Sequence, residues 1–120
     1  ILTGGILRKG FYCTTGSLVR DNLKCFRVDT CFLATNGLSL RAGLTTPNSA
    51  HAEIKRAMAE ISSQVIVLCD SSKIGVDYLS VVMPLRQVDM IITDNNIDSE
   101  DQMALLEAKV PLTVVNSKDK

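Results

Sequence analysis

The stretch Val65-Ile66-Val67-Leu68-Cys69-Asp70-Ser71-Ser72-Lys73 decides the fold of this chain. Its apolar half predicts a buried strand over residues 64–69, which stops abruptly in Asp-Ser-Ser-Lys. In open α/β sheets, ligands bind at the edge formed by the carboxyl ends of the strands. A carboxylate can accept hydrogen bonds from sugar hydroxyls there, and an ammonium suits a phosphate. The alternative is a turn-forming Asp and a surface Lys, and the residues alone leave both open.

Other short apolar segments alternate with segments of helical periodicity on both sides of this strand. Further strands are predicted at 1–3, 11–14, 30–35, 78–83, 90–93 and 112–115. Helices are predicted at 17–26, 50–62 and 99–108. This order predicts a single α/β domain with a largely parallel, covered sheet.

Polar residues mark where the predicted helices begin. Thr14 or Thr15 is expected to cap the first helix and Asn48 or Ser49 the second. Ser99, with Gln102 three residues later, predicts a capping box for the third. Between the Asn36-Gly37 turn and Pro47 we expect a loop of Gly and Thr residues.

Charge and composition exclude several classes of protein. The 120 residues are 46% hydrophobic, and 13 basic side chains balance 13 acidic ones, so the formal net charge is zero. A module that binds DNA by itself would normally carry a basic excess. No apolar run reaches the roughly 20 residues that span a bilayer, so no membrane is expected. The chain opens without Met inside an apolar segment, and we interpret it as a fragment of a longer protein.

The cysteines and the single histidine do not form a metal-binding or redox motif. None of the four cysteines belongs to a CxxC pair, and one histidine, His51, is too few for a Cys/His zinc cluster. We therefore expect reduced thiols in a cytoplasmic protein and no metal or other cofactor. The cysteines are Cys13, Cys25, Cys31 and Cys69.

Several polar groups follow the predicted strands. Gly4 and Gly5 could let backbone amides approach an anion, although an ordinary tight turn explains them as well. Asn36-Gly37 can likewise be a plain turn. Glu53 and Lys55 lie two positions apart in a helix and point to nearly opposite sides, so a solvated helix face is the simpler interpretation.

The sequence offers little for catalysis. No Ser stands in a GxSxG motif, and His51 lies in a predicted helix without an arranged partner. Asp29, Asp70 and Asp94 could supply acid–base carboxylates, but turn formation, helix-end contacts and binding of ligand hydroxyls are the roles that we assign to them. We predict no catalytic residue.

The motifs in their order resemble a known family, the carboxy-terminal sensor domain of DeoR-family transcriptional repressors, from residue 1 to about 115. The resemblance rests on Thr3-Gly4-Gly5-Ile6-Leu7-Arg8, Gly16, Asp29-Thr30-Cys31-Phe32-Leu33 with Asn36-Gly37, Gly43-Leu44-Thr45-Thr46-Pro47, Glu53-Ile54-Lys55, Asp70-Ser71-Ser72-Lys73 and Ile92-Thr93-Asp94. Any one of these motifs is weak, whereas seven in order are specific.

The resemblance implies a three-layer α/β/α fold with a mainly parallel sheet, related to ribose-5-phosphate isomerase and CoA transferases and truncated at its amino terminus. It implies a cytoplasmic bacterial repressor whose sensor domain, residues 1–116 here with a polar tail at 117–120, binds a phosphorylated sugar. Operator DNA would be bound by a winged helix-turn-helix absent from this fragment, and a homo-oligomer is expected. The ligand-binding residues implied are Gly4, Gly5, Asn36, Gly37, Glu53, Lys55, Asp70 and Lys73.

The chain departs from the family pattern in two ways. The family often has Asp where this chain has Asn36. Asn cannot act as a general base. An isomerase or deaminase on the same fold is therefore the less favoured alternative. The family's upstream Gly-Thr-Thr phosphate loop is also missing, so the effector site is expected to be partial. Missing strands would leave an unpaired edge and uncovered apolar surface, which predicts self-association or pairing of the 1–3 edge with another chain. A third hypothesis for the function of the chain is a purely structural oligomerisation domain.

Overall fold

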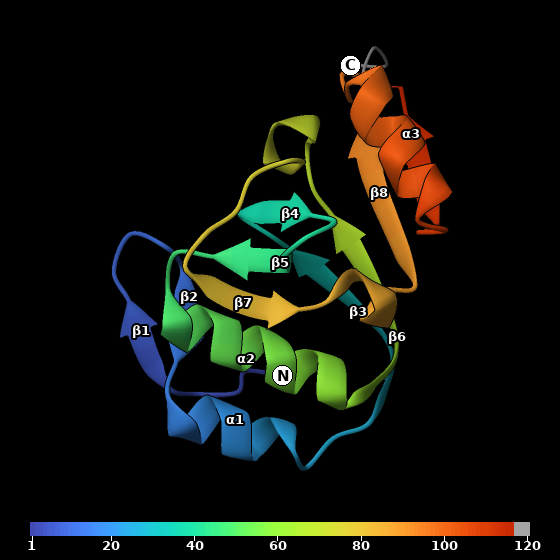
Figure 1. Ribbon diagram of the computed structural model, residues 1–120. Coiled ribbons are helices and arrows are strands. Elements are labelled where there is room, and N and C mark those ends of the chain that lie inside the picture. Colours follow the sequence, from blue (N-terminus) through green and yellow to red (C-terminus); the bar gives the residue numbers. More distant parts are fainter. Residues whose placement is uncertain (117–120) are drawn as a thin grey trace.

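A four-stranded parallel sheet forms the centre of the molecule (Figure 1). The computed structural model describes residues 1–116. The strands, in the order β3-β6-β8-β9, are β3 (Val28–Ala34), β6 (Ser62–Leu68), β8 (Met90–Asp94) and β9 (Leu112–Val115). One row of paired residues crosses the whole sheet and fixes its register: Leu33, Val67, Ile91 and Leu112. The α/β fold with a parallel sheet is thereby confirmed, and each of these strands lies within two residues of its predicted bounds.

A second, antiparallel sheet combines the strand predicted at 78–83 with two strands that lie where a loop was expected. It consists of β4 (Gly37–Ser39), β5 (Gly43–Thr46) and β7 (Ser80–Met83) in that order. The prediction of a Gly- and Thr-rich loop before Pro47 is therefore wrong. Gly43 has a φ of 74°, which glycine adopts without the penalty of a Cβ atom and which allows the tight reversal between β4 and β5.

The two longer helices begin at polar caps. The Oδ1 atom of Asn48 accepts from the backbone N–H of His51 at 3.0 Å, so α2 (Ser49–Glu60) has one of its two predicted caps. Helix α3 (Ser99–Glu107) is capped by Asp98, whose carboxylate accepts from the N–H of Glu100. The capping box predicted at Ser99 is wrong, because the cap lies one residue earlier and Ser99 is already helical.

The amino-terminal segment differs most from its prediction. No strand forms at residues 1–3; β1 (Ile6–Arg8) pairs instead with β2 (Cys13–Thr15), which begins two residues later than expected. Thr14 and Thr15, the two residues proposed as caps, both lie in β2. Helix α1 (Ser17–Leu23) therefore begins after Gly16 without a side-chain cap. It ends three residues before its predicted end. Two short 3-10 helices, η1 (Ser71–Lys73) and η2 (Leu85–Gln87), complete the fold.

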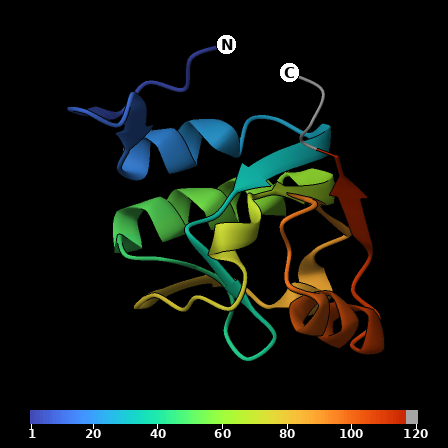
Figure 2. The same cartoon turned by 90° about the horizontal axis from the view of Figure 1, so that it is seen from above.

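The core lies between the parallel sheet and a layer made by α2, the antiparallel sheet and α3. Figure 2 shows this layer along one side of the sheet, and α1 packs against α2. Leu33, Val67 and Ile91 come from the parallel sheet, and each is at most 2% exposed. The opposite layer contributes Leu38, Leu44, Ala52, Val82, Met83 and Leu105.

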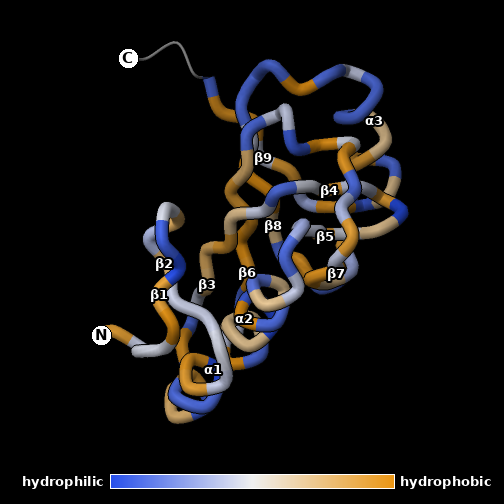
Figure 3. Tube along the Cα trace, turned by 90° about the vertical axis from the view of Figure 1, so that its left-hand side faces the viewer, coloured by the Kyte–Doolittle hydropathy of each residue, from blue (hydrophilic) through white to orange (hydrophobic). Residues whose placement is uncertain are grey.

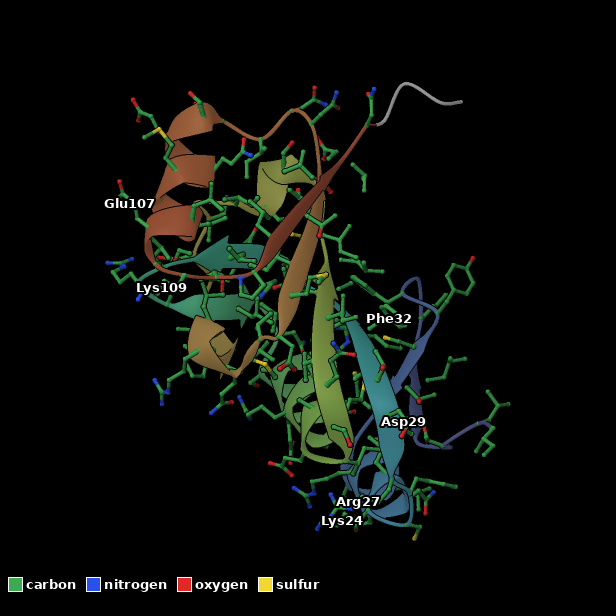
Figure 4. All side chains as sticks on the ribbon, turned by 90° about the vertical axis from the view of Figure 1, so that its right-hand side faces the viewer. Lys24, Arg27, Asp29, Phe32, Glu107 and Lys109 are labelled. Carbon is green, nitrogen blue, oxygen red and sulfur yellow. The ribbon has the colours of Figure 1, made fainter. Side chains whose placement is uncertain are left out.

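The other face of the parallel sheet is open among residues 1–116. Alternate residues of a strand point to opposite faces, and in β3 Cys31 and Leu33 are buried whereas Phe32 between them is 60% exposed. Leu68 of β6 is 44% exposed on the same outer face. Figure 4 shows Phe32 projecting from the sheet, and Figure 3 shows apolar residues along its strands. Parallel sheets are normally covered on both faces, so this surface is unusual.

Candidate functional site

The carboxyl ends of β3, β6 and β8 meet at one edge of the parallel sheet. Ala34 pairs with Leu68, and Leu68 pairs with Ile92, so the three strands end nearly level. The loops that follow carry the polar residues predicted for strand ends, which are Asn36, Asp70, Ser71, Ser72, Lys73 and Asp94. We call this region the carboxyl edge.

Asp94 shapes the loop after β6. Its carboxylate accepts from the backbone N–H of Ser71 at 2.8 Å, from the Ser71 hydroxyl at 2.9 Å and from the N–H of Asn96 at 2.8 Å. These bonds lower the pKa of Asp94, and the backbone bond from Ser71 contributes most. Asp94 thus ties two neighbouring loops together, which agrees with the structural role assigned to it from the sequence.

Asp70 and Lys73 stand side by side on η1. Asp70 caps this turn by accepting from the N–H of Ser72 at 3.0 Å and from the Ser72 hydroxyl, and the hydroxyl is the main reason that the pKa of Asp70 is lowered. Its second carboxylate oxygen lies 4.0 Å from the Nζ atom of Lys73. Both side chains remain about half exposed. A carboxylate and an ammonium are therefore presented to solvent next to each other.

Lys55 and Asn36 lie at the end of the neighbouring strand β3. The Nζ atom of Lys55 donates to the carbonyl of Ala34, the last residue of β3, at 2.6 Å. Burial lowers the pKa of Lys55. The Oδ1 atom of Asn36 accepts from the Thr46 hydroxyl at 2.9 Å. The edge thus brings together Asn36, Gly37, Lys55, Asp70 and Lys73 from the predicted site.

Packing accounts for Gly37 without a ligand. A Cβ atom at this position would lie 2.4 Å from the carbonyl oxygen of Val76 and 2.8 Å from the Thr45 hydroxyl. A glycine is therefore required where β4 begins, beside the segment that leads to β7.

Three predicted site residues contact α1 instead of the edge. Glu53 forms an ion pair with Arg20 of α1. Gly4 lies against Leu18, and a Cβ atom on Gly5 would come within 2.3 Å of a Val19 methyl group. Asp29 lies near the amino end of β3, at the opposite end of the strand from the carboxyl edge.

Two hollows of the surface deserve comparison. A shallow one of about 380 Å³ follows the carboxyl edge and is lined by Leu68, Cys69, Asp70, Ile92, Thr93, Asp94 and Val115. Among residues 1–116, the buried hydroxyl of Thr93 has no hydrogen-bond partner. A larger hollow of about 630 Å³ lies near the amino ends of β8 and β9 and is bordered by Arg41, Arg86 and Lys109. No local pattern predicts this larger hollow, because its three cations come from three separate segments of the chain. Ligands of open sheets bind at carboxyl ends, so the smaller hollow is the better candidate. Of the eight predicted ligand-binding residues, Asp70 lines this hollow, whereas Asn36, Gly37, Lys55 and Lys73 do not.

The fold and this edge define a class of protein. It is a small α/β domain whose strand-end loops present carboxylate, amide and ammonium groups, as ligand-binding sheets do. Among residues 1–116 no group of three potential metal-ligating side chains occurs. No helix in this part of the chain is both long and apolar enough to cross a membrane.

The chain belongs to the DeoR C-terminal sensor domain family. The model of that family matches residues 1–95. The match confirms the resemblance drawn from the ordered motifs. A sensor domain is a binding module, and the relatives below are named as regulators, which agrees with the expectation that this domain is not an enzyme.

Curated relatives match almost the whole chain. The HTH-type transcriptional regulator GlpR of Haloferax volcanii is 34% identical over 115 residues, which are 96% of this chain and 44% of the relative. The uncharacterized HTH-type transcriptional regulator YulB of Bacillus subtilis is 35% identical, over 96% of this chain and 45% of its own. A putative aga operon transcriptional repressor of Escherichia coli O157:H7 is 30% identical, over 96% and 43%. The chain therefore spans less than half the length of these relatives.

Proposed function

We propose that this domain senses a phosphorylated sugar and controls the DNA binding of a bacterial transcriptional repressor that acts in the cytoplasm. The observation that carries the proposal is the pairing of Asp70 with Lys73 at the carboxyl edge, one strand away from Lys55. A carboxylate suits sugar hydroxyls and an ammonium suits phosphate.

The site comprises Asn36, Gly37, Lys55, Asp70 and Lys73. Lys73 binds the phosphate, Asp70 accepts from hydroxyl groups, and Lys55 adds a second cation at the end of β3. The Asp94 carboxylate does not contact the ligand in this proposal; it fixes the loop that carries Asp70 and Lys73. Gly4, Gly5 and Glu53 stay outside the site because they contact α1.

Regulation follows from a shift between conformations. The relatives are named HTH-type regulators and are more than twice as long as the segment they share with this chain. Operator DNA would therefore be bound by another part of the protein. The whole protein would act as a homo-oligomer. A ligand changes DNA affinity only if it binds one arrangement of the protein more tightly than the other. The phosphorylated sugar would favour the arrangement that releases DNA.

A thermal-shift screen of the full-length repressor tests the proposal. Sugar phosphates and the corresponding free sugars are added in parallel, and a specific ligand must raise the melting temperature because it binds the native state. We expect a response to a sugar phosphate and none to its free sugar. If no sugar phosphate raises the melting temperature, the sensor function proposed here is wrong, and turnover of a sugar phosphate would favour the enzyme alternative.

Lys73→Ala then tests the residue assignment. Loss of a charge-assisted hydrogen bond to phosphate should weaken binding about tenfold, measured by calorimetry. Lys24→Ala is the matched control, because Lys24 is an exposed lysine directly after α1 whose partner is Asp21, also at an i,i+3 spacing. Equal affinities of Lys73→Ala and the wild type would remove Lys73 from the site.

A further inference from the structure

The imidazole of His51 is held between α2 and the β1–β2 ribbon by three contacts. Its Nε2 atom lies 3.4 Å from the Sγ atom of Cys13 and 3.1 Å from an Nη atom of Arg8. Phe11 meets the ring edge-on, with centroids 6.2 Å apart and planes at 78°, and the Arg8 guanidinium lies 4.1 Å above the Phe11 ring. The ring is therefore fixed with Nε2 toward the thiol.

This cluster is positively charged and open to small molecules. Cys13 lines a hollow of about 160 Å³ with Thr14, His51, Ile54, Lys55 and Met58, and its side chain is half-buried. The charged groups around the thiol are Arg8 from β1 and Lys55 from α2. The thiolate is the reactive form of cysteine, so a proton acceptor beside the thiol matters for its chemistry.

The protonation state of His51 suits a proton acceptor. Burial lowers its pKa, and the charges of Arg8 and Lys55 lower it further, so the ring is neutral near pH 7. The Arg8 guanidinium can only donate, so its contact assigns the unprotonated nitrogen to Nε2. Nε2 has a single lone pair, so Arg8 must turn aside before this nitrogen can take a proton from the thiol. The same nitrogen faces the thiol of Cys13.

We propose that Cys13 is a peroxide-reactive thiol activated by His51. Nε2 takes the thiol proton, and the sulfur attacks one oxygen of hydrogen peroxide and breaks the O–O bond. The sulfur becomes a sulfenic acid, a two-electron oxidation, and the departing hydroxide takes the proton from the imidazolium and leaves as water. The peroxide is the oxidant and is reduced in the same step, so no further reactant is needed.

The other cysteines of the chain lack this environment. Burial raises the pKa of Cys31, and burial together with Asp70 and Asp94 raises the pKa of Cys69 to about 11. Cys25 is exposed, and its contact in the structure is the backbone carbonyl of Asp21, to which its thiol donates at 3.9 Å. Cys25 is thus an internal reference for an accessible thiol without a base beside it.

Peroxide oxidation with trapping of sulfenic acid by dimedone tests the assignment on the intact protein. Adduct formation at each cysteine is followed by peptide mass spectrometry. We expect Cys13 to react about tenfold faster than Cys25 in the native protein. In denaturing urea the two rates should become similar, because the cluster is lost.

His51→Gln provides the decisive variant, since it keeps a polar side chain of similar length and removes the base. The excess rate of Cys13 over Cys25 should disappear, while circular dichroism shows the same helix content. A native Cys13 that reacts no faster than Cys25 would overturn the proposal, as would a folded His51→Gln protein with the original ratio. If His51→Gln does not fold, the native and denatured rate ratios of the wild type decide the question alone.

Discussion

At the scale of single residues, one carboxylate organises the candidate site. Asp94 receives three hydrogen bonds from two loops, whereas Asp70 and Lys73 present their charges to solvent. A carboxylate that accepts several hydrogen bonds has a lowered pKa, because the bonds favour its charged form. The stability that Asp94 adds therefore depends on pH.

Asp94→Asn should lower the melting temperature at pH 7, because an amide nitrogen would face an N–H donor. The folded pKa of Asp94 lies below the unfolded value of about 3.9, so its stabilisation is present above that value and is lost as the pH falls through the folded pKa. The difference between wild type and variant should therefore shrink between pH 5 and pH 2.

Thermal unfolding monitored by circular dichroism across this pH range measures the effect. Asp21→Asn is the control, because Asp21 is exposed and its contacts are surface ion pairs, which contribute little. A destabilisation by Asp94→Asn that stays constant from pH 7 to pH 2 would contradict this account of Asp94.

At the scale of elements, continuous apolar runs made the parallel sheet predictable. Strands β3, β6, β8 and β9 and helix α2 follow from local patterns, because burial of apolar side chains dictates them. The β4–β5 hairpin cannot be predicted in this way, since its strands of three and four residues, rich in Gly and Thr, show no alternation. The β1–β2 ribbon is defined by cross-strand pairing, which the order of residues does not reveal.

The difference between local sequence patterns and contacts of distant segments also explains which parts of the site could be predicted. Asp70 and Lys73 follow a strong strand directly, so the sequence places them at its carboxyl edge. Gly4, Gly5 and Glu53 were assigned through family resemblance, and their contacts depend on where α1 packs. The Cys13–His51 contact joins residues 38 positions apart, so no local sequence pattern predicts it.

The tight reversal between β4 and β5 depends on a glycine. At Gly43, a Cβ atom would lie 2.2 Å from the carbonyl oxygen of Met83 in β7, and φ is positive. Gly43→Ala should therefore destabilise the protein by about 2 kcal/mol or more, because strain and a backbone clash add. Urea unfolding measures the change.

Gly10→Ala separates these two causes. Gly10 also has a positive φ, 82°, but its Cβ atom would meet nothing within 4 Å. Gly10→Ala should thus show the conformational strain alone, about 1 kcal/mol. If both variants lose the same stability, the close approach of β5 to β7 does not constrain Gly43.

At the scale of the whole molecule, the parallel sheet is covered on one face only among residues 1–116. The outer face exposes Phe32, Leu68 and Val115, and β3 is an edge strand of its sheet. Residues 1–3 form no strand within this chain, and their pairing with another chain stays a prediction. The predicted uncovered apolar surface lies on this outer face. Large exposed apolar patches mark interaction surfaces.

This face predicts that the 120-residue chain associates with itself at micromolar concentration. Phe32→Ser should shift the chain toward the monomer in sedimentation velocity, because it removes the largest apolar side chain of the patch while costing little stability at a position that is 60% exposed. Leu79→Ser is the control, since Leu79 is 91% exposed but precedes β7 in the other sheet. A monomeric wild type would exclude self-association through any surface. An equal shift by both variants would show that the copies associate through general hydrophobicity and not through the outer face of the parallel sheet.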